Sequence, residues 1–167
     1  MNASTIENSS STERTFVFLF RMLMAWTFLY AASHQVFNSN FTVAGFLSHT
    51  KTFHNIYAPL ASSALSPMLT LLVSYGHLLI GLSLLFGLLV LVSAAFGAAL
   101  LMMYWTAHMD WPFISDHNNF IVDFHIVYAL LCIYLIHRHA GHVWGLDAWA
   151  EKRPAVQERP ALHGLVA

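Results

Sequence analysis

The chain has 167 residues, of which 57% are hydrophobic and 9% are charged, and its formal net charge is −1 at pH 7. About a quarter of the residues of an ordinary soluble domain are charged, so this composition excludes that class and indicates an integral membrane protein. The near-zero net charge also excludes nucleic-acid binding, because phosphate contacts require clustered Lys and Arg residues.

The strongest single signal is a stretch without charge, since residues 52–109 contain no Lys, Arg, Asp or Glu. A helix needs about 20 mainly apolar residues to cross a bilayer. Two such helices joined by a tight turn account for this stretch. The length of the whole chain then suits one domain of four spans, and we expect any large catalytic domain to belong to a partner subunit.

We predict an all-α fold, an integral membrane four-helix bundle with up-down-up-down topology. Residues 1–15 are polar and are expected to form a flexible tail. The membrane domain covers residues 16–150, with spans at about 16–37, 67–89, 90–108 and 118–137. The second span begins at Pro67, a residue type that suits the first turn of a helix. Residues 151–167 form a cytoplasmic tail.

Two segments outside the spans are expected to lie at the membrane surface. Aromatic residues in the first outer loop, residues 38–66, favour shallow interfacial helices. Trp144 and Trp149 follow the fourth span, where indole rings commonly sit at the level of the lipid headgroups. Six of the seven Lys and Arg residues lie on the side of the termini, and only Lys51 lies on the other. The positive-inside rule therefore predicts a multi-pass protein of the inner (plasma) membrane with both termini in the cytoplasm.

Histidines and one aspartate interrupt the apolar spans. A rise of about 1.5 Å per residue places His34, His108, Asp123 and His125 near the outer ends of three helices, and His77 roughly 15 Å deep in the second span. Asp123 and His125 are expected in the second turn of the fourth span. If the helices turn these residues inward, the outer leaflet contains one polar, aromatic pocket.

A quinone site is the first chemical interpretation of this pocket. Histidine suits it because its proton affinity lies near the working pH. We expect His77, Asp123 and His125 to be the catalytic, proton-handling residues. Helical spacing places Trp26, Tyr30 and His34 on one face and Tyr104 and His108 on another. The residues expected to bind the cofactor are Trp26, Tyr30, His34, Tyr104, His108 and Arg21.

Other interpretations of the same residues remain open. Neutral imidazoles with Asp123 or Asp110 could bind a transition metal, although no HxxxH or HExxH pair is present, and no metal ligand is predicted. A bis-histidine haem needs two histidines at similar depth. The polar residues could also pair with one another to fix helix register. For Arg21, anchoring by a side chain that snorkels to the interface is the alternative to holding a lipid or quinone headgroup.

Several stretches resemble the DoxX/DoxD family of small four-helix membrane proteins: LFRMLMAWTFLYAASHQVF, YGHLLIGLSLLFGLL, ALLMMYW, NNFIVDFHIVYALL and GHVWGLDAW. They follow the family's order and cover most of residues 16–150. The resemblance implies a membrane subunit of a quinone-linked respiratory or sulfur-metabolism oxidoreductase, as in thiosulfate:quinone oxidoreductase. His77 departs from the pattern, because the family often carries an acidic residue after the preceding Gly.

Two functional hypotheses follow. The chain is either the quinone-facing subunit of a membrane oxidoreductase complex or a non-catalytic accessory subunit that stabilises a larger membrane complex. Both hypotheses predict the lipid bilayer and other subunits as partners, and the first adds quinone.

Overall fold

The computed structural model describes residues 10–114 and 119–166. It is mostly helical, at 73% of residues. Helices α2 (Ser11–Val36), α5 (Ser66–Phe86) and α6 (Val90–His108) are each long and apolar enough to cross a membrane. The expectation of a mainly α-helical chain is therefore confirmed, and these three helices have the length and composition that a membrane span requires.

Helix α2 begins at Ser11 rather than at Phe16. The side chain of Ser10 accepts a hydrogen bond from the Glu13 amide at 3.2 Å, which caps the helix. Glu13 also forms an ion pair with Arg138. Part of the expected tail is thus helical because it has its own cap and a charged partner, while residues 1–9 lie outside the described part of the chain.

The tight turn between the second and third spans is present. Pro67 lies in the first turn of α5, and Gly87 ends this helix with a φ of 66°, a conformation that glycine adopts readily. Asp147 comes from a distant part of the chain to cap α6, because its carboxylate accepts hydrogen bonds from the amides of Leu89 and Val90 at 2.7 and 3.1 Å.

The helix at the predicted fourth span, α7 (Phe124–His137), is shorter than expected. Asp123 is not in its second turn but caps its start, where Oδ1 accepts a hydrogen bond from the His125 amide at 3.0 Å. The predicted start near residue 118 is therefore wrong, and Asn118 itself lies outside the described residues. With 14 residues, α7 is about 21 Å long at a rise of about 1.5 Å per residue.

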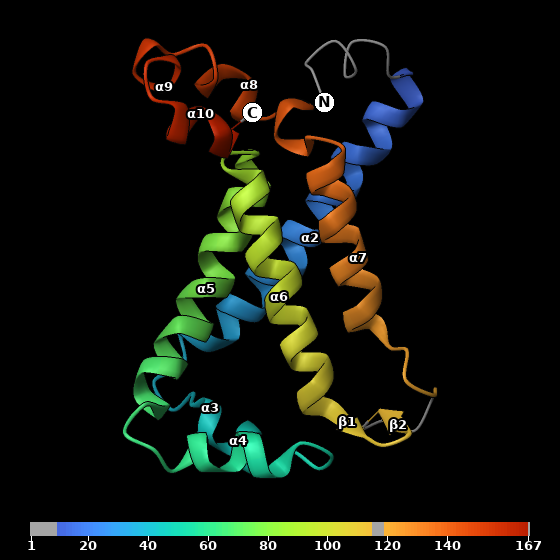
Figure 1. Ribbon diagram of the computed structural model, residues 1–167, viewed down its shortest axis with the longest axis vertical. Coiled ribbons are helices and arrows are strands. Elements are labelled where there is room, and N and C mark those ends of the chain that lie inside the picture. The colour runs from blue at the N-terminus through green and yellow to red at the C-terminus, as the bar shows by residue number, and fades with distance from the viewer. Residues whose placement is uncertain (1–9, 115–118, 167) are drawn as a thin grey trace.

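Short elements gather at the two ends of the molecule (Figure 1). One end carries α3 (Val43–Ser48), α4 (His54–Ala61) and a hairpin of β1 (Met109–Asp110) and β2 (Phe113–Ile114), in which Met109 pairs with Ile114. The other end carries the start of α2, the turn η1 (Ala140–His142) and helices α8 (Asp147–Ala150), α9 (Pro154–Gln157) and α10 (Pro160–Val166). The first loop contains short helices, as expected.

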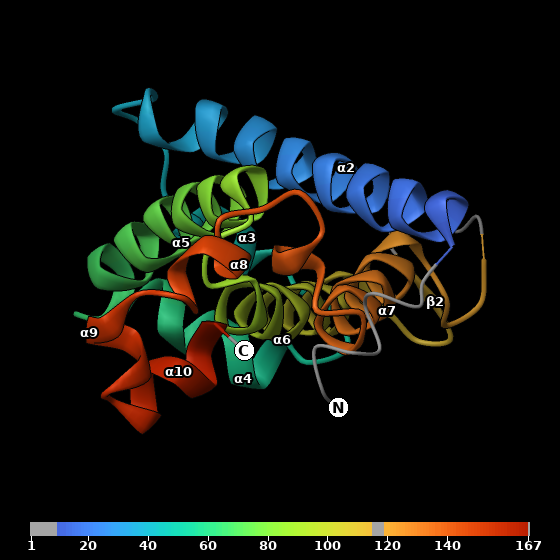
Figure 2. The same ribbon diagram turned by 90° about the horizontal axis from the view of Figure 1, so that it is seen from above.

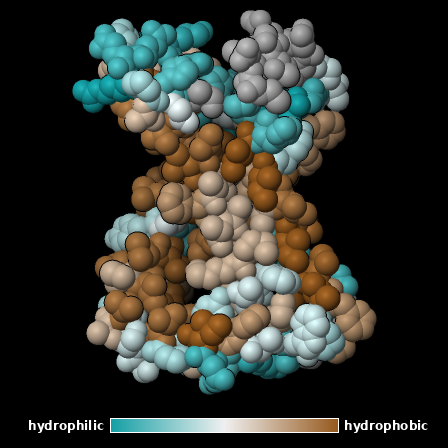
Figure 3. Space-filling model, viewed as in Figure 1, coloured by the Kyte–Doolittle hydropathy of each residue, from teal (hydrophilic) through white to brown (hydrophobic). Residues whose placement is uncertain are grey.

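An apolar belt lies between these ends, and polar residues gather above and below it (Figure 3). Within the belt α2 packs on α5 and α6 packs on α7. Figures 1 and 2 show that α2 and α7 lie close together near the chain termini and diverge toward the opposite end. The rings of Phe20 and Tyr134 meet at the closed end, with centroids 6.2 Å apart. A cavity lies between the helices toward the end that carries α3.

Candidate functional site

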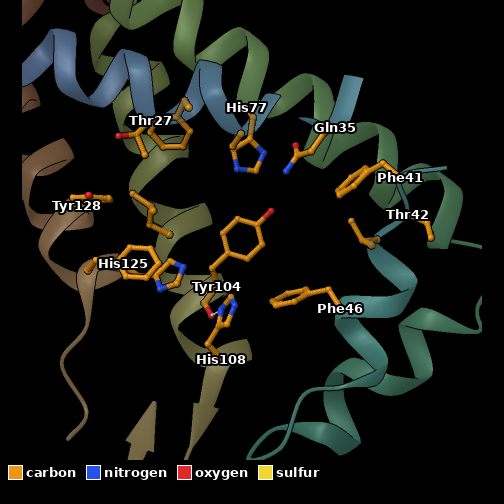
Figure 4. Close-up of a pocket in the computed structure, with 15 residues that line it drawn as sticks. Thr27, Gln35, Phe41, Thr42, Phe46, His77, Tyr104, His108, His125 and Tyr128 are labelled. Atoms are coloured by element: carbon orange, nitrogen blue, oxygen red, sulfur yellow. Dashed lines mark hydrogen bonds between the residues drawn. The ribbon is translucent and has the colours of Figure 1, made fainter. Parts of the chain in front are cut away.

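A cavity of about 340 Å³ lies between α2, α5, α6 and α7 and is covered by α3 (Figure 4). Fifteen side chains line it, and most of them are aromatic or imidazole rings. These rings belong to Phe28, Phe41, Phe46, His77, Tyr104, His108, Phe124, His125 and Tyr128. The cavity can therefore stack a flat ring and also offers polar groups to it.

His77 on α5 and His108 on α6 are held in the same way. Nδ1 of His77 lies 2.7 Å from the Val73 carbonyl oxygen, and Nδ1 of His108 lies 2.9 Å from the Tyr104 carbonyl oxygen. Because a carbonyl only accepts, each Nδ1 carries the proton and donates it. In the neutral ring Nε2 is then the acceptor.

His125 on α7 is oriented by a charged group. Its Nδ1 lies 2.6 Å from Oδ2 of Asp123, and the two side chains are only 7% and 11% exposed. A hydrogen bond to a carboxylate is stronger than one to a neutral acceptor, and it fixes the orientation of the imidazole ring. The predicted proton-handling residues Asp123 and His125 thus form one hydrogen-bonded pair at the cavity wall.

Tyr104 lies in the middle of the site and connects the histidines. Its ring centroid is 5.7 Å from that of His77 and 6.0 Å from that of His125, and His108 and His125 are 4.9 Å apart. In Figure 4 the Tyr104 hydroxyl points toward His77 and Gln35. The structure therefore brings together four of the predicted site residues, with Asp123 behind them.

The predicted stripe on α2 faces away from this cavity. Trp26 and Tyr30 are 68% and 58% exposed, and His34 is also exposed on the outside of the helix. The expectation that they line the pocket is corrected, because α2 packs on its neighbours through the face that carries Phe28. Regular spacing placed the three residues on one face but could not fix the rotation of the helix.

Arg21 lies far from the cavity, at the end that carries the chain termini. Its guanidinium donates to the carbonyl oxygens of Ala140, Val143 and Trp144 at 2.5, 3.0 and 3.2 Å, and the residue is 1% exposed. The guanidinium is buried rather than extended to the interface, and it does not line the cavity. Instead it fastens the segment after α7 to α2, because that segment folds back over the helix ends.

Gln35, Phe46 and Tyr128 also line the cavity, although none of them is among the predicted catalytic or cofactor-binding residues. Gln35 projects from α2 into the cavity in Figure 4, and within the described part of the chain its buried Oε1 has no hydrogen-bond partner. Tyr128 lies three positions after His125 on the same helix face, which is a signal that the sequence contains. Phe46 comes from the outer loop, whose fold over the pocket has no comparable signal.

A second, larger space has a different character. This apolar groove of about 750 Å³ runs between α5 and α6 and is lined mainly by Leu, Ile and Phe side chains, with Ser83 and Ser93 as its polar residues. The histidine cavity is the better candidate for chemistry, because imidazole and hydroxyl groups line it.

Residues 10–114 and 119–166 contain no group of three or more His, Cys, Asp or Glu placed to hold a metal ion.

Comparison of the chain with protein-family models, with curated proteins and with solved structures gives no match.

Proposed function

We propose that this chain is the membrane subunit of a quinone-linked oxidoreductase and binds the quinone headgroup in the histidine cavity. The observation that carries the proposal is the cavity itself, where three histidines from three helices and a central tyrosine meet among aromatic rings. Its volume of about 340 Å³ lies within the usual range for small-molecule sites. Mixed stacking surfaces and hydrogen-bonding groups suit a flat, apolar ring with two oxygen atoms.

The proposal includes a four-helix bundle in the plasma membrane. Helices α2, α5 and α6 are long enough to span, and α7 completes the bundle even though it has only 14 residues. A shorter helix is accommodated by a locally thinner bilayer or by neighbouring residues that reach the interface. Both described ends of the chain lie at the end rich in Lys and Arg, which supports a cytoplasmic location for them.

Reduction of the bound quinone takes two electrons and two protons and gives the hydroquinone. We assign proton delivery to the pair formed by Asp123 and His125, because its imidazole lines the cavity and its carboxylate stabilises the protonated ring. The electrons come from a reduced partner subunit. The resemblance to the DoxD membrane part of thiosulfate:quinone oxidoreductase supports a reduced sulfur compound as their source.

Quinone retention tests the proposal. Ala31 lines the cavity, and Leu23 lies on the same helix but is 60% exposed. We expect the protein purified in mild detergent to retain about one quinone per chain, and we expect Ala31→Trp to remove it by filling the cavity, whereas Leu23→Trp retains it. Equal retention by both variants, or no quinone in the unmodified protein, contradicts the proposal. The second result combined with a lower yield of the complex without this chain would support an accessory role.

A further inference from the structure

The two histidines held by helix carbonyls limit which redox form of a quinone the cavity can bind well. Nδ1 of His77 and Nδ1 of His108 are both committed as donors to their own helices. Each neutral ring therefore presents only an acceptor, Nε2, for a further hydrogen bond. A quinone carbonyl also only accepts, whereas a hydroquinone hydroxyl donates.

Packing keeps these rings in place. The ring of His77 packs against those of Phe28 and Tyr104, with centroid distances of 5.8 and 5.7 Å, and the residue is 5% exposed. The ring of His108 packs against Phe46 at 4.9 Å. A ring flip that presented the protonated nitrogen to a ligand would break the helix bond in each case. Nε2 of His77 and Nε2 of His108 therefore remain hydrogen-bond acceptors at the cavity wall.

We propose that the cavity selects the hydroquinone over the quinone through the Nε2 acceptors of His77 and His108. The Gln35 side-chain amide can donate through its nitrogen and accept through its oxygen, so it does not distinguish the two forms. The Tyr104 hydroxyl can donate or accept, so it serves both forms and does not distinguish them. The inference depends on the proposed function, because it concerns the ligand of the same cavity.

Selective binding of the hydroquinone changes the midpoint potential of the bound quinone/hydroquinone couple. When the quinone takes up two electrons from the reduced partner and two protons, the product gains hydrogen bonds that the substrate could not form. One neutral hydrogen bond supplies about a tenfold preference in affinity. A tenfold preference raises the midpoint potential of the bound two-electron couple by about 30 mV. The site thus favours reduction of the quinone and retains the product.

The test measures the affinity of the protein in lipid nanodiscs for three probes at pH 8 without oxygen. The probes are a decyl-substituted benzohydroquinone, the corresponding quinone and the dimethyl ether of the hydroquinone, which cannot donate. We expect the hydroquinone to bind at least tenfold more tightly than either of the others. We expect His77→Phe and His108→Phe each to reduce this preference several-fold.

His34 provides a matched control, because its Nδ1 also lies 3.0 Å from a helix carbonyl, that of Tyr30, but the residue is exposed outside the cavity. We expect His34→Phe to keep the full preference. Equal binding of hydroquinone and quinone by the unmodified protein overturns the inference and leaves the proposed function standing. Failure to bind either form overturns both. If His77→Phe does not fold, an unchanged preference in His108→Phe still counts against the inference.

Discussion

At the scale of single residues, Asp123 has two roles that one substitution can separate. Its Oδ1 accepts the His125 amide at the start of α7, and its Oδ2 accepts the imidazole proton at 2.6 Å. The first role needs only an oxygen acceptor, whereas the second needs a negative charge to support a protonated imidazole. Asparagine can perform the first role but not the second.

We therefore expect Asp123→Asn to lower quinone reduction by the assembled complex about 100-fold, a typical contribution of general acid–base catalysis. The melting temperature should remain near that of the unmodified protein, because Asn caps helices about as well as Asp. Asp123→Ala should lose the same activity and also about 1 kcal/mol of stability. Unchanged turnover in Asp123→Asn would remove the pair from the mechanism. Steady-state kinetics and thermal unfolding measure the two effects separately.

Asp147 makes the free energy of unfolding depend on pH, and burial of its carboxyl group sets the direction of this dependence. Burial raises its pKa above the ordinary value of 3.8, although the amides of Leu89 and Val90, together with His142 and Arg21, favour the charged form. Between the ordinary and the raised pKa the folded chain binds a proton that the unfolded chain has released. The free energy of unfolding must then fall as the pH rises through this window, and Asp147 adds no slope above it.

We expect Asp147→Asn to reduce this slope, which is at most about 1.4 kcal/mol per pH unit for one proton. Thermal unfolding in detergent between pH 4 and pH 7 provides the comparison, and the difference between variant and unmodified protein isolates Asp147 from the other acidic residues. If the free energy of unfolding falls more steeply with pH in the variant, the expected direction of the Asp147 contribution is wrong.

Among the elements, the segment after α7 holds together α2 and the start of α6. Arg21 of α2 binds its carbonyl groups, and Asp147 caps α6 from the same segment. Gly141 makes this fold possible, since a Cβ at this position would collide with the carboxyl group of Asp147. The sequence contains the segment as GHVWGLDAW, for which we predicted an interfacial role but not the buried contacts.

We expect Gly141→Ala to destabilise the protein by about 1–3 kcal/mol, the usual cost of overpacking. Gly45→Ala is the control, because a Cβ at Gly45 meets nothing within 4 Å. Chemical unfolding of both variants measures the difference. Equal stability of the two variants would mean that the segment after α7 does not need this close approach.

Some helix boundaries could be predicted from the sequence, and others depend on side-chain contacts in the folded chain. The turn between α5 and α6 was predictable because apolar residues continue on both sides of Gly87, and Pro67 marks the start of α5. The start of α7 was not, because the apolar residues before Phe124 continue the hydropathy pattern while the Asp123 side chain begins the helix. The rotation of α2 depends on its partners, so the outward position of Trp26 and Tyr30 required the packed structure.

For the molecule as a whole, an apolar belt separates two polar ends, and both described chain ends lie at the same one of them. The cavity lies toward the opposite end, with α3 as its cover. Composition alone predicted the membrane character, and the distribution of Lys and Arg predicted the orientation. The cavity required helices that diverge, a property without a signal in the sequence.

Labelling of single cysteines tests the orientation. Cys132 is fully buried, so we expect the unmodified protein to react very little with a maleimide. Ser48 is exposed at the end that carries α3, and Glu158 is exposed at the other end. We expect a membrane-impermeant maleimide to label Ser48→Cys in intact cells and to label Glu158→Cys only after the membrane is permeabilised. The reverse pattern would place the cavity in the cytoplasmic leaflet.

Photoaffinity labelling with an azidoquinone, followed by peptide mass spectrometry, shows whether a quinone occupies the histidine cavity. We predict covalent label within residues 27–46, 101–108 and 124–128, and its loss in the presence of excess unlabelled quinone. Label that is confined to the apolar groove between α5 and α6, or that unlabelled quinone does not displace, would contradict the claim.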